Sequence, residues 1–487
     1  MTLENAMNSF LKVMNKMLLT ILVLCYISCE QSKQADYLAL IERGEFTQAQ
    51  ATIENLLQSD TTLSSEERKQ LSFEIERMER IRKDFTKTEQ DVLEYIKKYI
   101  PNVTAQDLTR WEQEKSLESM SIDGKKRYFK LAARNLFRID KTCRNIWNEY
   151  HKDEKQPEKI NLDQHISEII AAHQETGKQY IKPVRIKYSY SITVKPDMVP
   201  EGETIRCWIP YPREISERQF NIKLLTSDPV EHIISDTSYL QRTIYFEKPS
   251  QGSEETKFSL QYEYTSQAIY VDIDPEKVKA TDPDSPLKAY LQEEYPHIVF
   301  SDELKELSQK IVGNETNPYR KAQQLFTWVD QNIPWASARE YSTIRHISSY
   351  CYQNMHGDCG IMALLQITLC RMNGIPARWQ SGWEFQPPDN SMHDWAMVYF
   401  EPYGWLPMDV DYGLRKSDDQ KIKFFYLGGI DSYRLVFNDA YSQPFYPEKV
   451  HHRSETVDSQ RGELEWLGGN LYYDQWDWNM NYEVLSQ

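Results

Sequence analysis

The spacing of apolar residues changes once along the chain, near residue 182, and this change constrains the fold more than any other feature. From about residue 35 to residue 175, apolar residues recur every three or four positions, which is typical of helices. Beyond the change they alternate with polar residues, as in Tyr188, Tyr190, Ile192 and Val194, which is typical of strands. The sequence therefore predicts a helical N-terminal domain over residues 30–178 and a small antiparallel β-domain over residues 180–270.

The rest of the chain mixes the two periods. An acidic, proline-containing linker over residues 272–284 precedes a helical stretch over residues 301–333. The chain has 487 residues, which is long enough for several domains. We expect a third domain over residues 285–440, an aromatic-rich C-terminal extension over residues 441–487, and the fold class α+β.

The net charge of −16 excludes one class of partner. Nucleic-acid binding depends on basic side chains that neutralise phosphates, and a chain this acidic has no excess of them. The charge is compatible with a soluble surface or a cationic substrate and does not identify a partner.

The N-terminus resembles a secretory signal. Lys12 and Lys16 precede an apolar run over residues 17–28, which is shorter than the roughly 20 residues that a membrane-spanning helix needs. Because Cys29 follows directly, residues 1–29 resemble a bacterial lipoprotein signal whose cysteine is lipidated. We expect an exported, membrane-anchored lipoprotein of the bacterial cell envelope; the alternatives are a plain signal peptide and an uncleaved anchor.

The other cysteines do not indicate a disulfide framework or a structural metal. Five cysteines remain after Cys25 and Cys29, an odd number without repeated spacing, and no two form a Cys-x-x-Cys pair. We therefore expect no metal and no cofactor.

One cysteine lies where a thiol can become a nucleophile. Cys359 follows Gly357 and Asp358 and begins an apolar helical pattern that stops at residues 373–374. A helix N-terminus stabilises negative charge, so this position favours the thiolate. Cys370, further along the same helix, fits the alternative of a buried inert cysteine.

A base and an acid follow the cysteine on a predicted hairpin. His393 lies near the start of one strand, residues 401–404 form a turn, and Asp409 and Asp411 lie on the return strand. The hairpin places His393 opposite residues 409–412, and the two aspartates share one face of their strand. Either could orient the imidazole, and a cysteine, a histidine and an orienting carboxylate are the groups of nucleophilic acyl transfer.

Four motifs in this order resemble the transglutaminase-like superfamily. They are Gly357-Asp-Cys359-Gly, Leu369-Cys-Arg-Met-Asn-Gly-Ile-Pro-Ala-Arg378, His393-x-Trp395 and Gly404-Trp-x-x-Met-Asp409. The resemblance, which extends to bacterial lipoproteins with this core, implies a papain-like transglutaminase core with the catalytic triad Cys359, His393 and Asp409. Asp411 stays an alternative acid.

The first candidate donor to the oxyanion is the backbone N–H of Cys359, and two side chains are alternatives for the second donor. Gln353 has the spacing from Cys359 of the oxyanion glutamine in papain-like proteases, and we favour it slightly. Trp335 has the place of the tryptophan that transglutaminases use.

The function expected is that of a cysteine enzyme acting on peptide or side-chain amide bonds through a thioester. We favour a hydrolase, a peptidase or amidase, over a transglutaminase that forms cross-links between proteins. Its partner would be a protein or peptide substrate, with cell-wall peptide as one candidate, and not a nucleic acid. The alternatives from other classes are a non-catalytic binding lipoprotein with a degenerate core and a helical scaffold for a partner.

Overall fold

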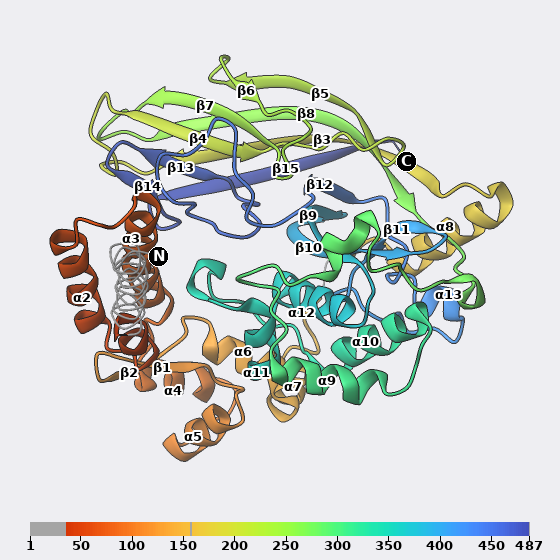
Figure 1. Cartoon of the computed structure of the whole chain (residues 1–487), viewed down its shortest axis with the longest axis horizontal. Coiled ribbons are helices and arrows are strands. Elements are labelled where there is room, and N and C mark those ends of the chain that lie inside the picture. The colour runs from red at the N-terminus through yellow and green to blue at the C-terminus, as the bar shows by residue number, and fades with distance from the viewer. Residues whose placement is uncertain (1–35, 156–157, 487) are drawn as a thin grey trace, which may run out of the picture. The chain divides into compact units, whose positions relative to one another are not determined.

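The computed structural model of the chain describes residues 36–155 and 158–486. They divide into two compact units (Figure 1). The first comprises residues 36–112 and 117–132, and the second comprises residues 113–116 and the described residues from 133 onward.

The first unit is helical with one short hairpin. Its elements are α2 (Phe46–Ser59), α3 (Ser65–Asp84), α4 (Glu89–Lys97), α5 (Ala105–Gln113), β1 (Ser119–Ile122) and β2 (Lys125–Tyr128). Helix α3 begins where the Ser64 side chain accepts from the backbone N–H of Glu67 while the Glu67 side chain accepts from that of Ser64. This reciprocal cap fixes the position at which α3 begins.

The second unit contains two antiparallel sheets on one side. One has the strand order β14-β13-β4-β7-β6 and the other the order β15-β3-β8-β5. The strands are β3 (Tyr180–Val194), β4 (Thr204–Pro210), β5 (Gln219–Asp228), β6 (Ile233–Ile234), β7 (Thr243–Pro249), β8 (Thr256–Ile269), β13 (Glu463–Trp466), β14 (Gly469–Leu471) and β15 (Trp476–Ser486). Along β3 buried residues alternate with less buried ones, because its period of two places one face inward.

Strands from the end of the chain complete both sheets. Strand β13 pairs with β4, and β15 pairs with β3 over most of its length. The domain boundaries expected from the sequence stay predictions, but the segment after residue 441 is joined to the strands of residues 180–270 by backbone hydrogen bonds.

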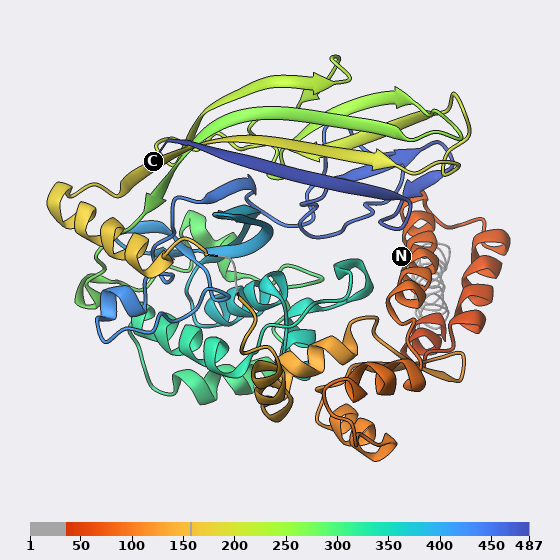
Figure 2. The same cartoon turned by 180° about the vertical axis from the view of Figure 1, so that it is seen from behind.

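The remaining part of the second unit is a helical layer on a small antiparallel sheet (Figures 1 and 2). The sheet has the order β11-β10-β9-β12. Its strands are β9 (Ala377–Gln386), β10 (Asp389–Phe400), β11 (Gly404–Met408) and β12 (Arg434–Asn438). The helices of the unit are α6 (Ala132–Ile139), α7 (Lys141–Tyr150), α8 (Leu162–Thr176), α9 (Asp302–Val312), α10 (Pro318–Asn332), α11 (Ile347–Asn354), α12 (Cys359–Met372) and α13 (Gln420–Lys423), with 3₁₀ turns η1 (Pro275–Lys277), η2 (Pro286–Leu291) and η3 (Tyr341–Thr343).

Helix α12 lies at the centre of this layer. Every residue from Gly360 to Arg371 is buried, and the apolar ones belong to one cluster with residues of α9, α10 and the small sheet. The opposite face of the small sheet packs on the larger sheets, where the ring of Trp383 lies 4.4 Å from that of Tyr188. The predicted α+β class is therefore confirmed, and its helical and sheet layers hold α12 between them.

The predictions for the N-terminus lie outside the described residues. They concern the signal peptide over residues 1–29 and the lipidation of Cys29. Within residues 36–155 and 158–486, no helix combines the length and the apolar character that crossing a membrane requires.

Candidate active site

Cys359 is the first residue of α12, and its neighbours explain the Gly-Asp-Cys-Gly motif. Asp358 caps the helix by accepting from the backbone N–H of Ile361. A Cβ atom at Gly357 would lie 2.4 Å from the side chain of Ile361, and one at Gly360 would lie 2.2 Å from the hydroxyl of Tyr341. The two glycines are needed because other groups approach the backbone closely on both sides of Cys359.

His393 and the aspartates lie on the hairpin expected from the sequence. Strands β10 and β11 pair in the register Ala396↔Met408 to Phe400↔Gly404. Extending this register places His393 across from residue 411, within the predicted range of 409–412. Asp409 follows β11 directly and is fully buried.

Asp409 and Asp411 lie beside different nitrogens of the imidazole. The Nε2 atom of His393 lies 2.9 Å from Oδ2 of Asp409, a hydrogen-bonding distance. Oδ2 of Asp411 lies 3.7 Å from Nδ1. The Sγ atom of Cys359, one ring nitrogen of His393 and one carboxylate oxygen of Asp411 all lie within 4.8 Å of one another. Because Asp409 occupies Nε2, Nδ1 is the nitrogen left for the thiol.

The His393–Asp409 pair is ionised at neutral pH. Burial alone lowers the pKa of His393, but the carboxylates of Asp409 and Glu384 outweigh it and raise the pKa to about 9. Burial likewise opposes the charge on Asp409, yet His393 and Arg434 hold the pKa of this aspartate below its usual range. The imidazole is therefore held as a cation against a fixed carboxylate.

The thiol differs from the expectation that the helix N-terminus ionises it. Burial, followed by the carboxylates of Asp394 and Asp358, raises the pKa of Cys359 well above its usual range. The thiol donates to Oδ2 of Asp394 over 3.5 Å, and the capping carboxylate of Asp358 uses the N–H of Ile361. Burial and the neighbouring carboxyl groups together outweigh the helix dipole, and Cys359 is a neutral thiol.

Arg434 is a site residue that the sequence did not indicate. It is buried at the start of β12, and its Nη1 lies 3.0 Å from Oδ2 of Asp409. Its Nε donates to Asp431, and its guanidinium lies 4.2 Å from the centre of the Tyr412 ring. Arg434 thus holds the carboxylate that orients His393. Arg434 ends the run of residues 424–434, and the resemblance of this run to bacterial lipoproteins with a transglutaminase-like core was a signal that could have indicated it.

The two oxyanion candidates lie in different places. Gln353 is exposed on α11, and its amide donates to Glu303 over 3.2 Å. Its side chain does not line the cavity at Cys359, so the structure contradicts the preference for Gln353. The reason is that residues 351–354 continue α11, whose turn directs position 353 outward. Trp335 lines this cavity, and backbone hydrogen bonds join its neighbours to Gly357.

The residues of the site have chemical types that also bind metals. Cys359, His393 and Asp411 offer sulfur, nitrogen and oxygen atoms close together, a set that a transition metal accepts. The expected absence of a metal therefore stays a prediction.

Comparisons with known proteins address the family. A model described as the transglutaminase-like superfamily matches residues 305–410. No curated protein matches the chain.

Two solved structures are similar to the chain. A protein from Cytophaga hutchinsonii described as a candidate cysteine protease is 18% identical with a TM-score of 0.43, over 63% of this chain and 93% of that one. A candidate protease from Parabacteroides distasonis is 9% identical with a TM-score of 0.18, over 50% of this chain and 64% of that one. At these TM-scores the similarities support no conclusion about the site. Residues 305–410 match the transglutaminase-like superfamily model, and Cys359, His393 and Asp409 all lie within the matched range.

Proposed function

We propose that the chain is a cysteine acyl-transfer enzyme that hydrolyses peptide or side-chain amide bonds through a thioester on Cys359. The observation that carries this proposal is the geometry around His393. One ring nitrogen lies 2.9 Å from the buried carboxylate of Asp409, and a thiol at the start of a buried helix lies within 4.8 Å of a ring nitrogen. This arrangement suits proton transfer between sulfur and nitrogen.

The proposed acylation uses these groups in order. In the fraction of molecules in which His393 is neutral, its free ring nitrogen takes the thiol proton, and the thiolate attacks the amide carbonyl carbon. The oxyanion accepts from the backbone N–H of Cys359, with the Trp335 indole as a second donor. His393 then gives its proton to the departing amine nitrogen, the carbon–nitrogen bond breaks, and a thioester remains.

Deacylation reverses the roles. His393 takes a proton from water, the resulting hydroxide attacks the thioester carbon, and the carbon–sulfur bond breaks to release a carboxylic acid and the thiol. An amine in place of water would give a new amide, which is the cross-linking reaction. We favour water because the sequence resembles that of an exported lipoprotein and because Cys359 lies in a cavity of about 330 Å³ rather than on an open surface.

Alkylation tests whether the thiol is activated. The rate of iodoacetamide labelling of Cys359 is compared with that of buried Cys370, in wild type and in His393→Ala. We expect Cys359 to react faster and the difference to depend on His393. Equal labelling rates for Cys359 and Cys370, or a Cys359 rate that is the same in wild type and His393→Ala, would favour the alternative of a non-catalytic binding protein.

A second assay separates the two enzyme reactions. A glutamine-containing peptide is incubated with and without an amine donor, and the products are weighed by mass spectrometry. We expect a product with the mass of the free acid. Incorporation of the amine without cleavage would show that the cross-linking reaction is the correct one.

The anchored location is proposed from the N-terminal sequence alone. We expect the full chain to fractionate with membranes and Cys29→Ala to lose acylation and leave the membrane fraction. An unchanged distribution of Cys29→Ala would contradict lipidation.

A further inference from the structure

The cavity at Cys359 is lined by several charged side chains, most of them acidic. Its wall combines carboxyl groups, two arginines and aromatic rings. The carboxyl groups are those of Glu340, Asp358, Asp394, Glu455 and Asp458, and the arginines are Arg339 and Arg461. The lining thus carries three more potential negative charges than positive ones.

The segment between β12 and β13 forms one side of this cavity. Its residues Glu455, Asp458, Gln460 and Arg461, here called the C-terminal wall, all line the cavity. Gln460 ties the wall to the reactive residues, because its Nε2 donates to the backbone carbonyl of His393 and to Oδ1 of Asp394. The wall is therefore held against the strand that carries His393.

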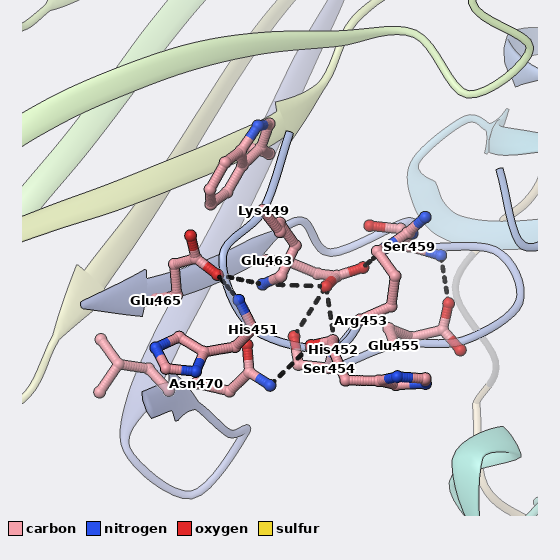
Figure 3. Close-up of polar contacts among 12 residues, drawn as sticks. Lys449, His451, His452, Arg453, Ser454, Glu455, Ser459, Glu463, Glu465 and Asn470 are labelled. Carbon is pink, nitrogen blue, oxygen red and sulfur yellow. Dashed lines mark hydrogen bonds and ion pairs between the residues drawn. The ribbon is translucent and has the colours of Figure 1, made fainter. Parts of the chain in front are cut away.

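Buried ion pairs hold this segment on strand β13 (Figure 3). Glu463 accepts from Nε of Arg453 over 2.6 Å, from the backbone N–H of Ser454 over 2.8 Å, and has the Lys449 ammonium 3.2 Å away. Glu465 accepts from the backbone N–H groups of residues 450 and 451. A buried ion cluster contributes little net stability, but it fixes the geometry of the segment it joins.

The wall's own cation, Arg461, pairs with a residue outside the wall, although its charge also acts to lower the pKa of Asp458. Arg461 lies 3.5 Å from Glu340 and covers the ring of Tyr473. Across the described part of the chain, neither Glu455 nor Asp458 forms an ion pair with a lysine or arginine. Buried acids of this kind are held in the protonated form, and a cationic group of a ligand placed beside them would stabilise the ionised form.

The protonation of the pair agrees with this view. Burial, followed by the charge of Asp458, raises the pKa of Glu455 well above its usual range. Burial and Asp394 raise the pKa of Asp458 to about 8. Without a cation beside them the two acids retain their protons, which an incoming cationic group would displace into solvent.

We propose that the cavity binds a substrate whose acyl part carries a side-chain ammonium group, such as a peptide with lysine or another diamino acid beside the reacting amide. The inference rests on the proposed function and names its substrate class. Glu455 and Asp458 receive the ammonium, and the rings of Trp335, Tyr473 and Trp478, which also line the cavity, offer faces that attract organic cations.

The same chemistry could belong to an acceptor amine, but the charge of the wall argues against it. An acceptor must attack the thioester as a free base. A wall of carboxyl groups stabilises the charged form, which has no lone pair to attack with. The ammonium therefore belongs to the part of the substrate that does not react.

Protection of Cys359 from iodoacetamide measures this recognition directly. The two probes are Nα-acetyl-lysine amide and Nα-acetyl-norleucine amide, which differ in the ammonium group. We expect the lysine probe to give half-protection at a concentration lower by about tenfold or more. Equal protection by the two probes would overturn the proposal, and so would protection by calcium chloride with none by the lysine probe.

The wall variants assign the effect. Asp458→Asn and, separately, Glu455→Gln should reduce the difference between the probes to about twofold. Glu483→Gln, an exposed carboxylate on β15 outside the cavity, is the matched control and should keep the full difference. Circular dichroism checks that each variant is folded; because Glu455 accepts backbone N–H groups of its own segment, Asp458→Asn is the decisive variant. A full difference retained in folded Asp458→Asn refutes the role of the wall.

Turnover measurements show which part of the substrate carries the recognised ammonium group. They also distinguish failure of this proposal from failure of the proposed function. Paired peptides with lysine or norleucine beside the scissile amide are compared by kcat/KM, and we expect the lysine preference to appear mainly in KM. If Asp458→Asn changes the rate of amine incorporation but leaves kcat/KM for the acyl-donor peptide unchanged, the assignment of the ammonium to the acyl part is wrong. If Cys359 is unreactive, titration calorimetry of both probes into the wild-type protein still decides whether the cavity prefers the cation.

Discussion

The neutral state of Cys359 leads to a prediction about Asp394. Oδ2 of Asp394 lies 3.5 Å from Sγ, and a thiolate formed there would face a neighbouring carboxylate. Two unit charges at that separation repel by about 5 kcal/mol at an effective dielectric constant of about 20, and by about 1.2 kcal/mol at about 80. Burial, followed by the charge of Asp358, raises the pKa of Asp394 itself, so protonation already relieves most of this repulsion, and we take about 1.2 kcal/mol as the part that Asp394→Asn would still remove.

Asp394→Asn should therefore make the thiol more reactive. At pH 7, a gain of about 1.2 kcal/mol in thiolate stability corresponds to a rise of about sevenfold in the thiolate fraction. The lower basicity of the thiolate offsets part of this gain in rate. The assay is the second-order rate constant for iodoacetamide alkylation of Cys359 between pH 5 and pH 10, with labelling localised by mass spectrometry.

Asp389→Asn is the matched control, since Asp389 lies on the same strand but is exposed and pairs with Lys159. We expect its pH profile to superimpose on that of wild type, while the profile of Asp394→Asn moves to lower pH. A profile for Asp394→Asn that coincides with wild type, in a folded protein, would refute the view that this carboxyl group keeps the thiol protonated.

Three further outcomes follow from the site. Asp409→Asn should lower kcat for amide turnover by a factor of about 10² to 10⁴. Asp411→Asn should lower it less, because Asp409 is the aspartate within hydrogen-bonding distance of the imidazole. The raised pKa of His393 contributes about 3 kcal/mol of stability below pH 6.5, and this contribution is lost as the pH rises through about 9. Urea unfolding of wild type and His393→Gln should therefore show a smaller difference in unfolding free energy between the two proteins at pH 10 than at pH 6. Gly360→Ala should cost about 1 to 3 kcal/mol of unfolding free energy because its Cβ meets the Tyr341 hydroxyl, and adding Tyr341→Phe should recover part of that loss.

Features encoded over a short stretch of chain were predicted well. The hairpin that carries His393 and Asp409 follows from a turn and two alternating strands within about 20 residues. The start of α12 at Cys359 follows from a break of two residues before a helical apolar pattern. In these cases the residues that determine the structure are adjacent in sequence, so periodicity and turn chemistry are sufficient.

Features that depend on distant residues could not be predicted. Arg434 contacts Asp409 from 25 positions away, and no local pattern indicates its partner. The protonation of Cys359 depends on Asp394, which approaches the sulfur only after β10 has packed against α12. Gln353 was preferred on spacing alone, and spacing does not say which face of a helix is directed at a neighbouring site.

The position of the C-terminal wall has a consequence for how the protein is made. The chain leaves the ribosome from its N-terminus, so Cys359, His393 and Asp409 all emerge before the strand that anchors the wall. Glu463, which holds the segment carrying Glu455 and Asp458, lies on β13, and β13 takes its place only by pairing with β4. During synthesis the nucleophile and its base therefore exist before the surface that selects the substrate. The order of translation separates the acquisition of reactivity from the acquisition of selectivity.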